Sequence, residues 1–188
     1  MKKTVWTFGL IAGAILSAMM LATMPFMDRI GFDTGEVIGY TTLVAALLLI
    51  FFGVRSYRDN QAGRSISFGR AFLVGLLINL VASACYVATW EFIYFRMAPD
   101  FGDKYAAHTL EKERAKGATE EQLARKTAEM QRFQELYRNP LFNVAVTFLE
   151  PFPAGLVVSL LSAAVLRRRR DPASILSEGP AAGISAFL

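Results

Sequence analysis

Four long apolar segments constrain the fold of this chain more than any other feature of its sequence. They cover residues 4–27, 37–54, 70–95 and 141–166, and the charged residues gather between them. A helix rises about 1.5 Å per residue and the hydrocarbon core of a bilayer is about 30 Å thick, so roughly 20 apolar residues cross it. The sequence therefore predicts an all-α fold, an integral membrane four-helix bundle.

The first apolar segment follows two lysines, as a secretory signal peptide does. It is longer than the apolar part of such a peptide, and no clear small-residue cleavage site ends it. We therefore expect an uncleaved first helix. A single four-span membrane domain then occupies residues 1–170. Residues 171–188 are rich in Ala, Gly, Pro and Ser, a composition that predicts a disordered tail.

Lysine and arginine in the short connections predict the orientation of the spans. Ten of them lie before the first segment, between the second and third, and after the fourth, whereas residues 28–36 contain only Arg29. We therefore expect cytoplasmic N- and C-termini. The basic residues that give the net charge of +4 then serve mainly to orient the chain in the lipid bilayer. We therefore expect no nucleic-acid partner.

Residues 97–139 form a polar insert that we expect on the outer side of the membrane. Gly117 predicts a helix end, and Thr119 with Gln122 predicts a capping box at the start of a second helix. The insert is thus predicted to be an extramembrane helical hairpin between the third and fourth spanning helices. One face of its second helix is apolar, and this stripe packs on the partner helix, lies on the membrane surface or binds another protein.

The fourth apolar segment contains a carboxylate, Glu150, followed by Pro151 and Pro153. At helical rise Glu150 lies about 5 Å from the centre of the span, where a charge costs several kcal/mol. It is therefore protonated, hydrogen-bonded inside the bundle or in contact with a water-filled cavity. Each proline lacks an N–H, so we expect the carbonyls of Thr147 and Leu149 to be freed beside it.

A second acidic residue, Glu91, lies near the outer end of the third segment, beside Trp90 and Tyr94. It is either an interfacial carboxylate within an aromatic belt or a neighbour of Glu150, brought close by packing of the third and fourth spans. Asn143 and Thr147 are candidates to line the same polar site.

Small and polar residues inside the spans predict close helix packing. Gly9, Gly13 and Ser17 form one ridge, Gly75 and Asn79 a second, and Gly155 lets a neighbouring helix approach the fourth span. Tyr57, Arg58 and Asp59 are predicted to form a cytoplasmic turn in which Asp59 caps or pairs locally. Ser67 is a candidate N-cap for the third helix.

Several stretches together resemble a known family. They are Gly53–Asp59, Ile66–Phe72, Thr89-Trp90-Glu91 with Tyr86 and Tyr94, Pro99-Asp100-Phe101 with Tyr105, Asn139-Pro140, and Phe148–Gly155. The chain resembles the bacterial four-span membrane proteins grouped as domain-of-unknown-function family 4199, over roughly residues 3–170. The resemblance implies four helices, an insert before the last helix and an inner-membrane location, and it implies no established activity.

Three functions follow as hypotheses. The first is a small inner-membrane protein that acts through contacts with membrane or envelope proteins, or with a second copy of itself. The second is proton- or cation-coupled transport that uses Glu150, and the third is a lipid-modifying enzyme with Glu91 and Glu150 as an acid–base pair. We find no nucleophile motif, no metal-ligand spacing and no cofactor motif, so we assign no catalytic residue, metal or cofactor, and the balance is against an enzyme.

Overall fold

The computed structural model describes residues 1–61 and 65–167. Its helices are α1 (Lys2–Thr23), the 3-10 helix η1 (Met24–Phe26), α2 (Met27–Ile30), α3 (Phe32–Asp59), α4 (Phe68–Phe92), the π-helix η3 (Ile93–Met97), α5 (Phe101–Ala115), α6 (Glu120–Tyr137), α7 (Pro140–Phe148) and α8 (Pro151–Leu166). The tail predicted to be disordered, 171–188, lies outside the described residues, as do Gly63, Arg64 and Arg168–Arg170.

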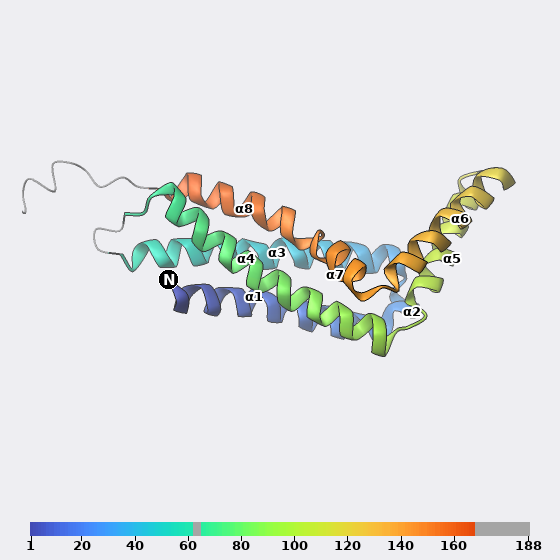
Figure 1. Cartoon of the computed structure of the whole chain (residues 1–188), viewed down its shortest axis with the longest axis horizontal. Helices are drawn as coiled ribbons and strands as arrows, with labels where there is room; N and C mark the ends of the chain where they lie inside the picture. Colours follow the sequence, from blue (N-terminus) through green and yellow to red (C-terminus); the bar gives the residue numbers. More distant parts are fainter. Residues whose placement is uncertain (62–64, 168–188) are drawn as a thin grey trace, which may run out of the picture.

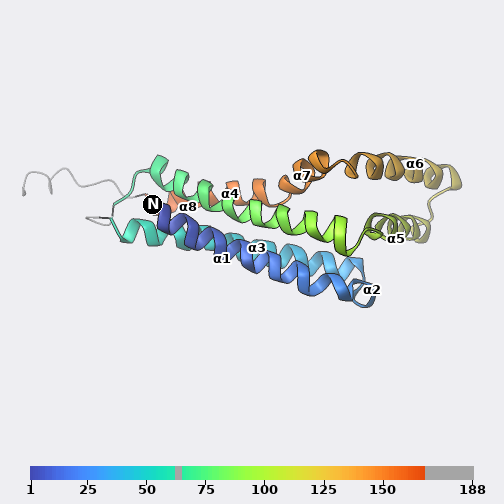
Figure 2. The ribbon, with the colours of Figure 1, turned by 60° about the horizontal axis from the view of Figure 1, so that its bottom comes forward.

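Four helical stretches are long and apolar enough to cross a membrane: Lys2–Ile30, Phe32–Asp59, Phe68–Met97 and Pro140–Leu166. They lie side by side as one bundle, while α5 and α6 extend past one end of it (Figure 1). The start of α1, the end of α3, the start of α4 and the end of α8 gather at the opposite end (Figures 1 and 2). The prediction of an all-helical protein with four long apolar helices is confirmed.

Helix α3 is longer at both ends than the predicted span 37–54, because the helix continues beyond its apolar part. Tyr57, Arg58 and Asp59 consequently belong to its last turn and do not form a separate turn. The side chain of Tyr57 is buried. Asp59 pairs with Arg58 at 2.7 Å and with Arg55, four residues earlier, at 3.8 Å. The pair with Arg55 has the four-residue spacing of neighbours on a helix surface, as expected where the helix continues through Asp59.

Small residues allow α1 to lie directly against α4. A Cβ atom on Gly9 would stand 2.7 Å from the Cβ of Val81, and one on Gly13 would meet Cys85. Ser17, one turn further on, accepts a hydrogen bond of 2.7 Å from the hydroxyl of Thr89. The ridge predicted on the first span therefore faces the third.

The contact between α4 and α8 also depends on small residues. Gly75 faces Ser159, and a Cβ on Gly155 would overlap the amide of Asn79. That amide is fully buried and donates a hydrogen bond of 3.0 Å to the carbonyl of Phe152. The interior of the bundle also contains large apolar side chains with at most 1% exposure, namely Leu16, Leu47, Ile50 and Ile78.

The predicted caps lie at the turn between α5 and α6. Gly117 adopts φ +85°, and Thr119 and Gln122 form both hydrogen bonds of the capping box, so that prediction is confirmed.

Helix α5 docks on the α2–α3 corner. The ring of Phe32 lies 5.6 Å from that of Phe101, and Lys112 reaches Asp33 at 2.6 Å.

Candidate functional site: an acidic aromatic cavity

A break in the fourth span positions Glu150. Helix α7 ends at Phe148 and α8 starts at Pro151, because Pro151 has no N–H to donate to the carbonyl of Thr147. The expectation of a free carbonyl there is wrong: the N–H of Glu150 donates to it at 3.3 Å. This tighter bond leaves Leu149 and Glu150 between the two helices, with the side chain of Glu150 exposed at the break.

The carboxylate of Glu150 is partnered by a tyrosine from a neighbouring span. The hydroxyl of Tyr86, on α4, donates a hydrogen bond of 2.7 Å to Oε2 of Glu150. Hydrogen bonds to a carboxylate are stronger than those between neutral groups. Of the alternatives left open by the sequence, hydrogen bonding within the bundle is therefore present.

Glu150 also lines a cavity of about 300 Å³ in the half of the bundle near the hairpin. A second carboxylate, Glu36 on α3, lines the same cavity, and the lining residues include no lysine, arginine or histidine. Aromatic and sulfur-containing side chains make up most of the wall: Phe32, Tyr40, Tyr86, Trp90, Phe101, Tyr105, Tyr137, Met19, Met20, Met24 and Met27. The site thus combines two acids with many polarisable groups.

Helix periodicity on α3 explains why one helix supplies several of these groups. Glu36, Tyr40 and Leu43 recur at steps of four and three residues, so they share a face. Gly35 and Gly39 lie beside them along the cavity wall. A Cβ atom on Gly39 would meet nothing within 4 Å, and the absence of a side chain there leaves room in the cavity.

A chain of hydrogen bonds holds the wall formed by α4, α6 and α7. Nε1 of Trp90 donates to the hydroxyl of Tyr137 at 2.8 Å, and Thr147 donates to Oδ1 of Asn143 at 3.0 Å. The hydroxyls of Tyr137 and Thr147 are 2.9 Å apart. Since the proton of Thr147 is used for Asn143, Tyr137 donates to Thr147. Burial raises the pKa of Tyr137, which keeps its hydroxyl protonated as this chain requires.

The residues predicted for the polar site do not all lie at the cavity. Asn143 and Thr147 join the hydrogen-bond chain behind the cavity, whereas Glu91 is not among the residues that line it. Glu91 follows Tyr86 by five residues, so its side chain is turned by about 140° around α4. Its Oε1 is buried and has no hydrogen-bond partner among the described residues. Pro151 is buried, and Pro153 is exposed in the first turn of α8.

Sequence reasoning missed Glu36, Tyr40 and Tyr86 as members of the site. The four-residue step from Glu36 to Tyr40 at the end of an apolar segment was a usable signal for the first two. Tyr86 and Glu150 are 64 residues apart, and no local pattern links them.

The family profile described as "Protein of unknown function (DUF4199)" matches residues 7–168. No curated protein and no solved structure matches the chain. The match spans all four apolar helices and the hairpin, and it includes both carboxylates of the cavity. The chain therefore belongs to the DUF4199 family of proteins of unknown function.

Proposed function

We propose that this is a multi-pass protein of the bacterial inner membrane that binds a small organic cation in the cavity around Glu150. Its termini face the cytoplasm and its hairpin lies on the outer side. The basic residues at the start of α1, near the end of α3 and at the start of α4 support this orientation, since these parts of the helices lie at the end of the bundle opposite the hairpin (Figure 1).

The observation that carries this proposal is the charge of the cavity. Glu36 and Glu150 both line it, and no lysine, arginine or histidine of the described residues lines it with them. Tyr86 donates to Glu150, and its neutral hydroxyl brings no positive charge to the cavity. A cation entering the cavity supplies the missing charge.

The walls favour an organic cation over a bare metal ion. Tyr40, Tyr86 and Trp90 line the cavity, and a desolvated cation–π contact with one such ring stabilises binding by about 2 kcal/mol. A volume of about 300 Å³ is at the lower limit for small-molecule pockets, and it is far larger than one ion requires.

Access is expected from the hairpin side alone. The other half of the bundle is closed by Leu16, Leu47, Ile50 and Ile78, so a path across the membrane requires those helices to separate. Binding is therefore the simplest activity of this site. Coupled flux requires an additional conformational change, and acid–base catalysis by a Glu91–Glu150 pair lacks support, since Glu91 does not line the cavity.

Titration calorimetry of the protein in lipid nanodiscs tests the proposal, with tetramethylammonium as the probe and sodium as the competing small ion. We expect saturable tetramethylammonium binding that sodium at equal concentration does not prevent. Glu150→Gln should weaken binding at least tenfold, which corresponds to about 1.4 kcal/mol. Glu36→Gln should weaken it in the same direction.

Glu91→Gln is the matched control, because it removes a carboxylate from the same end of the bundle but outside the cavity wall. Its affinity should equal that of the unmodified protein. Equal losses in all three variants, or no tetramethylammonium binding by the unmodified protein, would refute the proposal. Liposome flux measured with the same probe then reports whether binding leads to transport.

A further inference from the structure

The hairpin has almost no core of its own. Helix α5 has no buried residue and α6 has only Leu123. Its large apolar side chains remain partly uncovered: Tyr105 is 47% exposed and Phe133 is 48% exposed. Apolar area of this extent outside the spans is costly in water. The hairpin therefore requires something apolar to cover this face.

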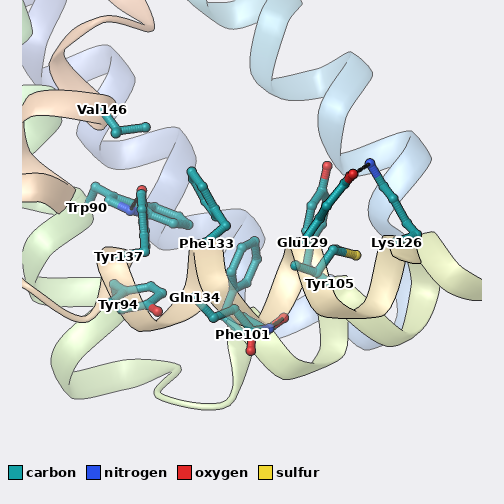
Figure 3. A pocket seen from close by; sticks show the side chains of 12 residues that line it. Trp90, Tyr94, Phe101, Tyr105, Lys126, Glu129, Phe133, Gln134, Tyr137 and Val146 are labelled. Atoms are coloured by element: carbon teal, nitrogen blue, oxygen red, sulfur yellow. Dashed lines mark hydrogen bonds and ion pairs between the residues drawn. The ribbon is translucent and has the colours of Figure 1, made fainter. Parts of the chain in front are cut away.

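A groove of about 500 Å³ runs along that face, between the hairpin and the outer ends of α4 and α7. Figure 3 shows the rings of Trp90, Phe133, Tyr137 and Phe101 along it. Two polar groups of this wall are already engaged. Nε1 of Trp90 donates to Tyr137, and the amide of Gln134 donates to the carbonyl of Gly102 at 2.6 Å. The groove thus presents mainly carbon to whatever occupies it.

The groove begins at two of the apolar helices. Trp90 and Val146, at one end, belong to the apolar stretches that are long enough to cross a membrane. Lys126 and Glu129, whose charged groups are 3.9 Å apart, lie at the other end (Figure 3). The twelve residues of α6 from Lys126 to Tyr137 are joined by eleven helical steps and span about 16 Å. The groove therefore leads from the edge of the hydrocarbon to a pair of opposite charges.

We propose that this groove holds one hydrocarbon chain of a membrane phospholipid. The chain enters beside Trp90 and Val146, packs against Met130 and Phe133, and removes their apolar surface from water. Lys126 and Glu129 match a head group that carries a phosphate and an ammonium group, because each charge of the pair meets its opposite. The groove shares part of its wall with the cation cavity, because Trp90, Phe101, Tyr105 and Tyr137 line both. The lipid proposal does not rest on cation binding.

The two tryptophans of the chain permit a direct test. Trp6 lies near the start of α1 and Trp90 lies in the groove wall, so Trp6→Phe leaves Trp90 as the only indole. The protein is placed in phosphatidylcholine nanodiscs in which a fixed fraction of the acyl chains carries bromine, a quencher of indole fluorescence. The comparison protein is Trp90→Phe, which keeps Trp6 as its only indole, in contact with the general lipid population. We expect the fluorescence of Trp90 in the first variant to be quenched more strongly than that of Trp6 in the second.

Variants of α6 test whether the brominated acyl chain that quenches Trp90 lies in the groove. Met130→Gln and Phe133→Gln make the groove polar and should remove most of the excess quenching of Trp90, whereas Met130→Leu should keep it. Leu136→Gln is the control, since Leu136 is 48% exposed on the same helix and does not line the groove. All variants are compared as monodisperse particles with the same helical circular dichroism.

Each other outcome overturns the proposal. Equal quenching of the two indoles means that no chain occupies the groove and leaves a protein partner as its cover. A loss with Leu136→Gln as large as with Phe133→Gln means that the hairpin rests on the membrane surface. Quenching that survives both glutamine substitutions in the groove means that Trp90 meets lipid from outside it.

Discussion

At the scale of single residues, two glycines show how the same residue type has opposite roles in this bundle. Gly155 lies where a Cβ atom would overlap Asn79, and Gly39 lies where a Cβ atom would meet nothing within 4 Å. The first glycine is required by close helix packing, and the second leaves space in the cavity. Substitutions at the two positions should therefore have opposite effects.

Replacing Gly39 with leucine should block ligand binding without destabilising the fold. The new side chain enters the cavity, and leucine favours a helix over glycine by up to about 1 kcal/mol. We expect an unchanged or higher midpoint of thermal unfolding in detergent, together with the loss of tetramethylammonium binding. Gly69→Leu, at the start of α4 where a Cβ also meets nothing within 4 Å, should leave binding intact. Undiminished binding by Gly39→Leu would show that the ligand binds elsewhere.

Replacing Gly155 with alanine should destabilise the protein despite the better helix propensity of alanine. The gain in propensity is at most about 1 kcal/mol, whereas overpacking a close contact costs about 1–3 kcal/mol and displaces the hydrogen bond from Asn79 to Phe152. We expect a lower midpoint of thermal unfolding, and Gly69→Ala provides the comparison. A midpoint equal to that of Gly69→Ala would mean that α4 and α8 separate easily at this contact.

At the scale of elements, rings rather than charges should hold the hairpin to the bundle. The ring centroid of Phe32 lies 5.6 Å from that of Phe101 and 5.7 Å from that of Tyr105. Each such aromatic pair contributes about 0.5–1.5 kcal/mol in addition to the free energy gained by burying its apolar area. The ion pairs Lys112–Asp33 and Lys104–Asp28 are exposed, and salt screens exposed pairs strongly. The aromatic contacts should therefore dominate docking of α5.

Hydrogen exchange in α5 tests this ranking. Phe32→Ala should accelerate exchange along the helix much more than Asp33→Asn, and the effect of Asp33→Asn should shrink further in high salt. Arg125→Gln, which breaks an exposed pair within α6, is the control and should leave α5 unchanged. The opposite order, with Asp33→Asn more disruptive than Phe32→Ala, would make docking electrostatic.

The pH dependence of docking follows from the same pairs. The hydrogen bond to Asp33 raises the pKa of Lys112, so this contact is present at neutral pH and is lost as the pH rises through the raised value. At the start of α5 itself, the hydrogen bond from Lys104 lowers the pKa of Asp100, the N-cap residue of this helix. This local contact is lost as the pH falls through the lowered value. Exchange in α5 should therefore change little between these two limits.

At the scale of the whole molecule, the hydrophobic pattern of the sequence was sufficient for the architecture. Spans and caps depend on local chemistry, so the four helices, Gly117 and the Thr119 box were predictable from neighbouring residues. The candidate site was only partly predictable, because the Tyr86–Glu150 bond joins residues on different helices. The broken backbone at Pro151 was anticipated, but the compensating bond from Glu150 to Thr147 depends on the local geometry of the break.

The proposed orientation makes a prediction about access from the two sides of the membrane. The chain has a single cysteine, Cys85, so Cys85→Ala gives a background without thiols. A cysteine in place of Glu121, exposed in α6, should react with a membrane-impermeant maleimide added to intact spheroplasts. A cysteine in place of Asn60, exposed at the end of α3, should react only after the membrane is permeabilised. The basic residues near Asn60 favour this arrangement. The reverse pattern of labelling would show that the protein has the opposite orientation, with the mouth of its acidic cavity toward the cytoplasm.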